Sequence, residues 1–430
     1  MLPKLVQSLQ RLRVVVTAAT VICVSATCLV AYAIGGCGPA NAQANAAREQ
    51  LPAPLVRVLI ERAVTSIKLS ATSPPVLESG AEAGSGPVRL NLPDVPVEMS
   101  LTASGWRLGD KQFPRGELIL AQTVDGTLSV NETTYRGRLR LVPQGRTSFD
   151  VVNDLDIEAY LAGVLPKELP SHWNAQTHRA QAVVARTYAL YELKTAGAKR
   201  GHFDVYDTDA SQVYGGRSAE TNKSRAAVEA TRGQVVVHET GDGPRIFKAY
   251  FHSTSGGATI GNNDAFAEPP VDTLSASVTG DYGSASTRHQ WEPFAVGKDE
   301  LARRFAAWGT RRGHPLRRLE RLDRLEIVAK SSAGRPTRFE IVDARQNHYS
   351  VTPEELRWAV NFDRGEGREL FSAWFTPINN ASNIVFADGR GWGHGVGMCQ
   401  WSAEGMAAAG RDYVDIVTTS YPGGRVVRAY

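Results

Sequence analysis

Cysteine is scarce in this chain of 430 residues, which contains four. Three of them, Cys23, Cys28 and Cys37, lie in or beside an apolar N-terminal segment, so removal of that segment would leave Cys399 alone. A single cysteine cannot form an intramolecular disulfide, so a disulfide-stabilised scaffold is excluded for the mature chain. With 42% hydrophobic and 21% charged residues, the composition indicates an ordered globular protein.

Two common catalytic patterns are also missing. No register of the glycine-rich stretch after Asp388 gives G-x-G-x-x-G, and no G-K-[ST] occurs, so a phosphate-cradling loop is excluded. The stretch STSGG from Ser253 to Gly257 lacks the G-x-S-x-G spacing, so a serine triad is not predicted. We interpret this stretch as a substrate-contacting loop, because its hydroxyls and exposed amides can donate and accept hydrogen bonds.

The N-terminus predicts export. Basic residues precede the apolar run 14–36, and Ala42 and Ala44 suit a small-residue cleavage site. The run is also long enough to span a bilayer, so an uncleaved anchor with the domain outside is the alternative. We therefore expect an extracytoplasmic protein, either secreted or anchored in the membrane through residues 14–36.

The composition predicts an α+β fold in three parts. Residues 1–44 are the signal peptide or membrane anchor. Short β-prone runs separated by Gly, Pro and Asn predict a small β-rich domain over 51–152, with a loop or linker at 70–87. Residues 153–430 are predicted to form a second domain, with a mixed β-sheet and a central helix, which contains the candidate site residues described below.

One carboxylate, Glu168, lies between two prolines immediately before a predicted long helix. Asn174 is the expected N-cap. The buried stripe of that helix consists of residues at helical spacing, namely Ala180, Val183, Val184, Thr187, Tyr188 and Tyr191. Because Pro166 and Pro170 break regular structure, we expect Glu168 on a loop at the rim of a site.

The neighbours of Glu168 are apolar: Leu165, Leu169, Pro170 and Trp173. Such a setting disfavours the charged form and raises the pKa toward the range of a general acid. The alternative interpretation is a solvated loop glutamate ahead of an ordinary amphipathic helix.

Glycines alternate from Gly389 to Gly397. In an extended segment they would all face one side, where a ligand or another backbone can approach closely. His394 lies on the other side, either as a structural histidine or as a site residue. A short helix from Ala403 to Ala409, ended by Gly410, is predicted to follow.

Together these segments resemble the stage II sporulation protein D and LytB (SpoIID/LytB) family of peptidoglycan-active proteins. The likeness covers roughly residues 140 to 425. It rests on YLAGVLPKELPSHW followed by AQAVVARTYAL, on SQVYGG at 211–216, on AYFHSTSGGATIGNNDAF at 249–266, and on GRGWGHGVGMCQWSAEGMAAAG.

The resemblance implies a lytic transglycosylase that cleaves peptidoglycan glycan strands, with Glu168 as the catalytic acid. One carboxyl can protonate the glycosidic oxygen and then deprotonate the C6 hydroxyl of the sugar, which closes a 1,6-anhydro ring. The alternative is a non-catalytic, wall-binding enhancer whose partner is a separate cell-wall amidase. A third interpretation is a glycan hydrolase, which would need a second carboxylate.

The predicted substrate-binding residues are Arg186, Tyr214, His252, Ser253 and His394. Arg186 interrupts a small, apolar run, and its guanidinium needs an anionic partner. We therefore expect it to bind substrate or to orient Glu168.

The chain departs from the family at two places. Some members have a zinc site built from one histidine and two cysteines, but the matching segment 202–216 contains no cysteine, so we predict neither a metal nor another cofactor. Cys399 stands where the family usually has serine, which indicates a small packed residue rather than a nucleophile.

The segment from Lys298 to Lys330 is rich in arginine, which raises the question of nucleic acid binding. A buried helical stripe of Leu301, Phe305 and Trp308, interspersed acids and export all favour a solvated helix face instead. We therefore predict no nucleic acid partner. A weak preference for anionic wall polymers is compatible with the same segment.

Overall fold

The computed structural model describes residues 52–79, 87–92, 95–122, 126–195 and 200–430. The apolar run 14–36, for which export or anchoring is predicted, lies outside these residues. Within the described ranges, no helix combines the length and apolar character needed to cross a bilayer.

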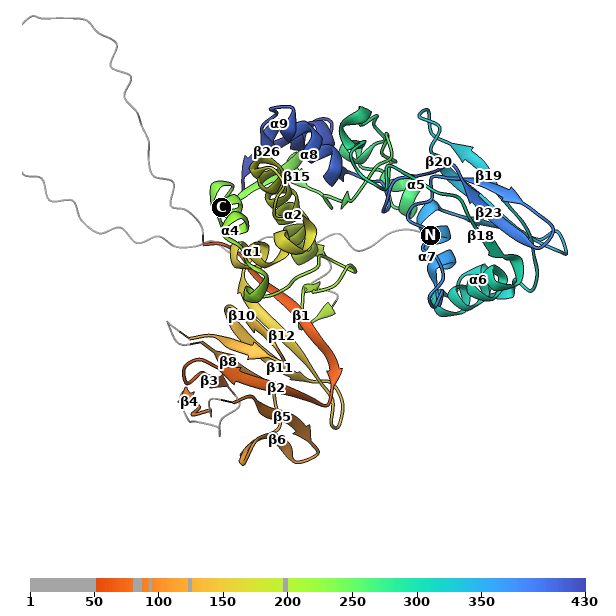
Figure 1. Cartoon of the computed structure of the whole chain (residues 1–430). Coiled ribbons are helices and arrows are strands. Elements are labelled where there is room, and N and C mark those ends of the chain that lie inside the picture. The colour runs from red at the N-terminus through yellow and green to blue at the C-terminus, as the bar shows by residue number, and fades with distance from the viewer. Residues whose placement is uncertain (1–51, 80–86, 93–94, 123–125, 196–199) are drawn as a thin grey trace, which may run out of the picture. The chain divides into compact units, whose positions relative to one another are not determined.

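Two sheets form the N-terminal part of the described chain (Figure 1). The seven-stranded sheet has the order β13 (Val205–Tyr206), β1 (Leu55–Val64), β12 (Phe149–Asp156), β11 (Arg138–Pro143), β8 (Leu118–Ala121), β3 (Val76–Ser79) and β4 (Val88–Arg89). The six-stranded sheet has the order β10 (Thr133–Tyr135), β9 (Leu128–Val130), β2 (Ser66–Ala71), β5 (Val97–Thr102), β6 (Gly105–Leu108) and β7 (Lys111–Phe113). The expected loop at 70–87 is wrong in part, because Val76–Ser79 pairs with β8 as a strand.

Two helices follow this sheet directly. Helix α1 (Ile157–Glu168) begins where β12 ends, because the Asp156 side chain accepts hydrogen bonds from the amides of the first turn. Helix α2 (Ala175–Thr195) begins after Asn174, whose side chain accepts from the Gln176 amide at 2.9 Å. The predicted N-cap is thus confirmed. Helix α2 is buried along most of its length, as expected of a central helix.

The remaining strands form several small sheets instead of the one mixed sheet that we expected. They are β14 (Gln234–Thr240) with β15 (Gly243–Ile246) and β26 (Gly424–Arg428); β16 (Phe251–His252) with β25 (Met398–Cys399); β17 (Gln290–Trp291) with β24 (Gly389–Arg390); β18 (Phe294–Gly297), β23 (Asn383–Ala387) and β22 (Thr376–Asn379); and β19 (Leu322–Lys330), β20 (Pro336–Asp343) and β21 (His348–Val351). The other helices are α4 (Asn222–Ala230), α5 (Asn262–Phe266), α6 (Lys298–Arg312), α7 (Pro353–Asn361), α8 (Gln400–Ala408) and α9 (Tyr413–Ser420). The α+β class is therefore confirmed.

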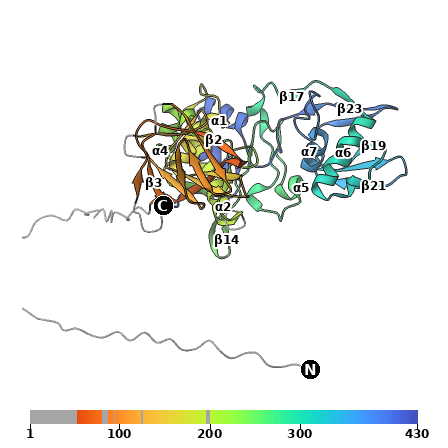
Figure 2. The same ribbon diagram turned by 90° about the horizontal axis from the view of Figure 1, so that it is seen from below.

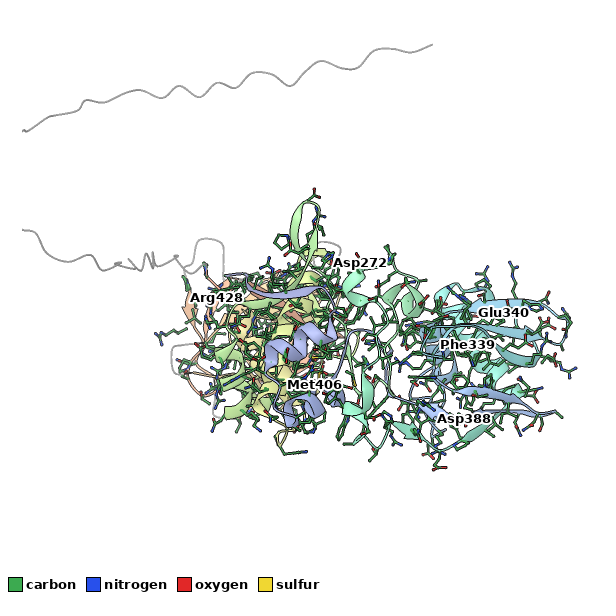
Figure 3. All side chains as sticks on the ribbon, turned by 90° about the horizontal axis from the view of Figure 1, so that it is seen from above. Asp272, Phe339, Glu340, Asp388, Met406 and Arg428 are labelled. Carbon is green, nitrogen blue, oxygen red and sulfur yellow. The ribbon has the colours of Figure 1, made fainter. Side chains whose placement is uncertain are left out.

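Helices α6 and α7 pack with strands β19 and β20 around a separate apolar cluster (Figure 2). The predicted stripe of Leu301, Phe305 and Trp308 is confirmed, since all three side chains are buried in this cluster. Strand β20 alternates in burial over its middle, from Arg338 to Ile341. Phe339 is fully buried, whereas the next residue, Glu340, pairs with His348 on the outer face (Figure 3).

The alternating glycines do not form the extended segment that we predicted. Gly391, Gly393, Gly395 and Gly397 all have positive φ, so the chain winds instead of running straight. The expected close approach of another backbone is confirmed. A Cβ at Gly397 would lie 2.1 Å from the Tyr250 carbonyl oxygen, and one at Gly391 would lie 2.7 Å from that of Thr254.

Candidate active site

Glu168 is the last residue of helix α1 and not a loop residue, so this detail of the expectation is wrong. Pro166 lies within the helix, because it removes only one amide donor while the Leu169 amide still reaches the Leu165 carbonyl at 2.9 Å. The helix ends at Leu169, whose extended backbone is what the following Pro170 requires. The carboxyl group is thereby held by a helix end.

The Glu168 carboxyl is largely withdrawn from water but reaches the surface, since the residue is half-buried. Its Oε1 accepts a hydrogen bond from the Val213 amide at 3.2 Å. Burial raises its pKa from 4.5 to about 7; the Val213 amide and the Gln400 side chain oppose this rise, and the charge of Asp209 adds to it. The negative end of the α1 dipole also disfavours a carboxylate at this position. A group with this pKa can both donate and accept a proton near neutral pH.

The SQVYGG segment supplies the amide that contacts Glu168. Tyr214 is buried, and its hydroxyl donates to Asn153 Oδ1 at 2.9 Å. Its ring packs so closely on α1 that a Cβ at Gly163 would lie 2.6 Å from it, and the Gly215 amide bonds to the Gly163 carbonyl. Tyr214, expected to bind substrate, therefore packs beneath α1, and we propose that it positions the Val213 amide.

Gln400, the first residue of helix α8, also lies beside the acid and was not identified from sequence. Its side chain is 7% exposed, and its Nε2 has no hydrogen-bond partner within bonding distance among the described residues. The amide nonetheless lies close enough to Glu168 to lower the pKa of that carboxyl. The only sequence signal was its place next to Cys399 in GMCQW.

Helix α8 is fastened to the start of α2, which explains why Gln400 faces Glu168. The Glu404 carboxylate accepts hydrogen bonds from the Asn174 amide, at 2.9 Å, and from the Thr177 hydroxyl, at 2.6 Å. Next to these contacts, the rings of Trp173 and Trp401 meet edge to face with centroids 4.9 Å apart. The residues after Glu168 are therefore held against those after Gln400.

Cys399 is buried and caps helix α8. Its sulfur accepts hydrogen bonds from the Ser402 amide at 3.3 Å and from the Ser255 amide at 3.2 Å. A serine hydroxyl can make the same bonds, so the exchange of serine for cysteine leaves a small packed capping residue, as predicted.

The structure brings His252 and His394 together, with ring centroids 5.5 Å apart. His252 is 4% exposed; its Nδ1 donates to the Val396 carbonyl at 3.1 Å, and its Nε2 has no partner among the described residues. Burial and the charges of His394 and Arg335 hold the pKa of His252 well below its usual value. Its β-register partner is Cys399, so His252 lies beside the residue that precedes Gln400.

His394 is half-buried, and its Nδ1 accepts a hydrogen bond from the Val396 amide at 3.0 Å. Burial and the charge of Arg357 lower its pKa to about 3. Both imidazoles are therefore neutral at pH 7. The hydroxyl of Ser253, also half-buried, lies 3.3 Å from that of Thr254.

Arg335, which was not identified from sequence, links the loop after Ser253 to the glycine-rich loop that contains His394. It is 2% exposed and donates to the carbonyls of Ser255 and Ala258, at 3.0 and 2.9 Å, and to that of His394, at 3.3 Å. The side chain would clash with a Cβ at Gly395. The glycine there leaves the space that this guanidinium occupies.

Arg186 has the anionic partner that its sequence context required, but the partner is Glu158. The guanidinium is fully buried and donates to both Glu158 oxygens, at 3.1 and 2.5 Å. Glu158 also accepts from the Gly233 amide and the Tyr430 hydroxyl. In place of the expected substrate contact, we propose that Arg186 holds α1 against α2 and so positions Glu168 indirectly.

Within the described residues, no group of three or more His, Cys, Asp or Glu side chains is placed to hold a metal ion. In the segment where some family members have zinc, His202 instead pairs with Asp150, with Nε2 2.8 Å from Oδ2.

Comparison with known proteins supports the resemblance. The family model described as stage II sporulation protein matches residues 145–238. An uncharacterized protein of Brachyspira hyodysenteriae is 30% identical over 313 residues, which cover 72% of this chain and 77% of that protein. Stage II sporulation protein D of Bacillus subtilis is 27% identical over 302 residues, 67% of this chain and 79% of that protein. The amidase enhancer of Bacillus subtilis is 27% identical over 61% of this chain, but the match covers 39% of that protein.

These matches and the fold define an α+β protein with a cell-wall-related role. Within that class, the chain belongs to the SpoIID/LytB family.

Proposed function

We propose that this protein is an extracytoplasmic lytic transglycosylase that cleaves peptidoglycan glycan strands with Glu168 as its one catalytic acid and base. The observation that carries the proposal is the Glu168 carboxyl itself, half-buried at a helix end with a pKa raised to about 7 by burial. A solvated glutamate would be ionised at neutral pH and could not donate a proton.

The reaction balances with this one carboxyl. Protonated Glu168 gives its proton to the glycosidic oxygen, the bond to the anomeric carbon breaks, and the ring gains oxocarbenium character. The resulting carboxylate removes the proton from the C6 hydroxyl, whose oxygen bonds to the anomeric carbon and closes the 1,6-anhydro ring. The enzyme ends with its proton restored.

The groups around Glu168 suit a sugar ligand. Gln400 Nε2 is a buried donor without a protein partner, and His252 Nε2 is an acceptor without one, among the described residues. A buried polar atom without a partner costs free energy unless a ligand or water satisfies it. We propose that a sugar hydroxyl or acetamido group bonds to the Gln400 amide beside the acid.

The experiment measures the fragments that the wild type and Glu168→Gln release from purified glycan strands. Loss of general acid–base catalysis should lower the rate by about 10²- to 10⁴-fold while the variant stays folded. Full activity in the folded variant would refute the role of Glu168.

The relative named amidase enhancer motivates a second candidate, a wall-binding protein that stimulates a separate cell-wall amidase. It predicts no strand cleavage by the purified protein and faster release of stem peptides when an amidase is added. Glu168→Gln should then leave the stimulation unchanged. The glycan hydrolase is a third candidate, in which Asp209, whose charge reaches Glu168, would be the second carboxylate.

A further inference from the structure

A separate pocket lies on helices α6 and α7. Its volume is about 640 Å³, within the range of ligand pockets. Residues that line it include Asp209, Arg311, Arg312, Trp358 and Glu369.

Trp358 gives the pocket an aromatic surface. Its side chain is 39% exposed, although a large apolar ring is usually buried. The ring is stacked against Phe266 at 6.5 Å between centroids, and the Arg312 guanidinium lies 5.7 Å from its centroid. Packing against Phe266 fixes the orientation of the ring, while Arg312 is exposed and has a flexible stem that a ligand can displace.

Charged groups of both signs surround this ring, and several of their side chains have no hydrogen-bonded or ion-paired partner among the described residues. The side chains of Arg311, Asp209 and Glu369 make no hydrogen bond or ion pair with any other residue that the structure describes. By contrast, Arg357 is held by Glu354 at 2.7 Å. The pocket thus offers free donors and free acceptors around an aromatic ring.

Two interactions link the pocket to the surroundings of Glu168. Burial is the main cause of the raised pKa of Glu168, and the charge of Asp209 adds to it. Asp209 also acts on Arg357: burial lowers the pKa of that guanidinium, whereas the charges of Glu354 and Asp209 raise it. Phe266, which packs on Trp358, also lies 5.3 Å from the ring of His394. One extended ligand can therefore reach both places.

These features match a sugar ring better than a polyanion. One face of a pyranose consists of C–H groups, whose partly positive hydrogens are attracted to the negative face of an aromatic ring. Around its rim the pyranose has hydroxyls, which both donate and accept hydrogen bonds. Asp209 and Glu369 would repel a phosphate-bearing polymer, whereas hydroxyls can donate to them. Arg311 and Arg312 can donate to the same rim.

We propose that this pocket is a saccharide subsite, in which Trp358 stacks on one sugar of a glycan strand whose cleaved linkage lies at Glu168. That the same strand binds both at Trp358 and at Glu168 rests on the proposed function. The subsite makes a long strand a better substrate than a short one, because binding energy remote from the reacting bond assists the transition state.

The first test compares kcat/KM for long glycan strands with that for tetrasaccharides, in the wild type, Trp358→Ala and Trp358→Phe. We expect Trp358→Ala to reduce the ratio of the two values about tenfold, and Trp358→Phe to restore most of it because a flat ring remains. Tyr282→Ala is the matched control, since Tyr282 is also 39% exposed and lies outside the pocket. An unchanged ratio in folded Trp358→Ala would overturn the subsite.

A second test does not need cleavage. Calorimetry compares strand binding by Glu168→Gln and by Glu168→Gln with Trp358→Ala, and the expected result is an about tenfold weaker Kd in the double variant. If no variant cleaves glycan but this loss appears, the proposed function fails and the subsite stands. Equal binding by the two variants, or a loss confined to a phosphate-bearing polymer, contradicts the subsite.

Discussion

Replacing Glu168 by glutamine should change how the stability of the protein depends on pH. The carboxyl has a pKa of about 7 in the folded protein, against 4.5 for the ordinary group, because burial disfavours its charge. Between these two values the folded state holds a proton that the unfolded state has released, so stability falls as pH rises. Glutamine is uncharged, keeps the volume, and can accept the Val213 hydrogen bond, so the variant lacks this loss.

The magnitude follows from the pKa. One pKa unit corresponds to about 1.4 kcal/mol, so above pH 7 the ionised carboxylate costs the wild type on the order of 3 kcal/mol. Below about pH 4.5 the wild type and the variant should have similar free energies of unfolding. From about pH 4.5 to pH 7 the wild type should become progressively less stable relative to the variant.

The assay is urea unfolding followed by tryptophan fluorescence across this pH range. Asp207→Asn is the matched control, since burial raises the pKa of Asp207 only to about 6 and its divergence should end one pH unit earlier. A difference in unfolding free energy between Glu168→Gln and wild type that does not vary with pH would show that the Glu168 carboxyl does not have a raised pKa in the folded protein.

Three further predictions concern the surroundings of Glu168. Asp209→Asn removes a charge that raises the pKa of Glu168, so the alkaline limb of the pH profile of kcat/KM should move down by about 0.3 pH unit at low salt. An upward shift of that limb would contradict this prediction. A loss of turnover beyond about 100-fold would favour the hydrolase. Arg186→Met leaves the Glu158 carboxylate buried and unpaired and should cost about 3–5 kcal/mol of unfolding free energy; an unchanged unfolding midpoint with a raised KM would instead favour substrate contact. Arg335→Gln should speed hydrogen exchange in both loops that its guanidinium joins and lower kcat; unaltered exchange would contradict its role as the link between them.

Local patterns in the sequence predicted the elements whose period or capping is strong. The Asn174 cap and the stripe of α6 are confirmed, because each depends on residues close in sequence. The predicted stripe of α2 is confirmed except at its last member, Tyr191, which is half-buried. The glycines after Asp388 were correctly read as places of close backbone approach. Their winding path was not predicted, because an alternation of glycines does not show whether the glycines have positive φ or are extended.

Contacts between distant segments could not be predicted in the same way. The apolar neighbours of Glu168 correctly indicated a desolvated acid, but the Val213 amide and the Gln400 side chain come from segments far along the chain. Arg186 was correctly expected to need an anion, yet nothing local distinguishes a buried partner such as Glu158 from a bound substrate. Burial likewise places Tyr214 beneath α1, although an exposed tyrosine would look identical in sequence.

The most direct test of the central claim is mass spectrometry of the strand ends formed by the full chain in water labelled with heavy oxygen. A transglycosylase that uses Glu168 as its one acid and base forms 1,6-anhydro ends that carry no label and are lighter than reducing ends by one water molecule, and Glu168→Gln forms none. Labelled reducing ends, or unlabelled anhydro ends made equally by the variant, would contradict this claim.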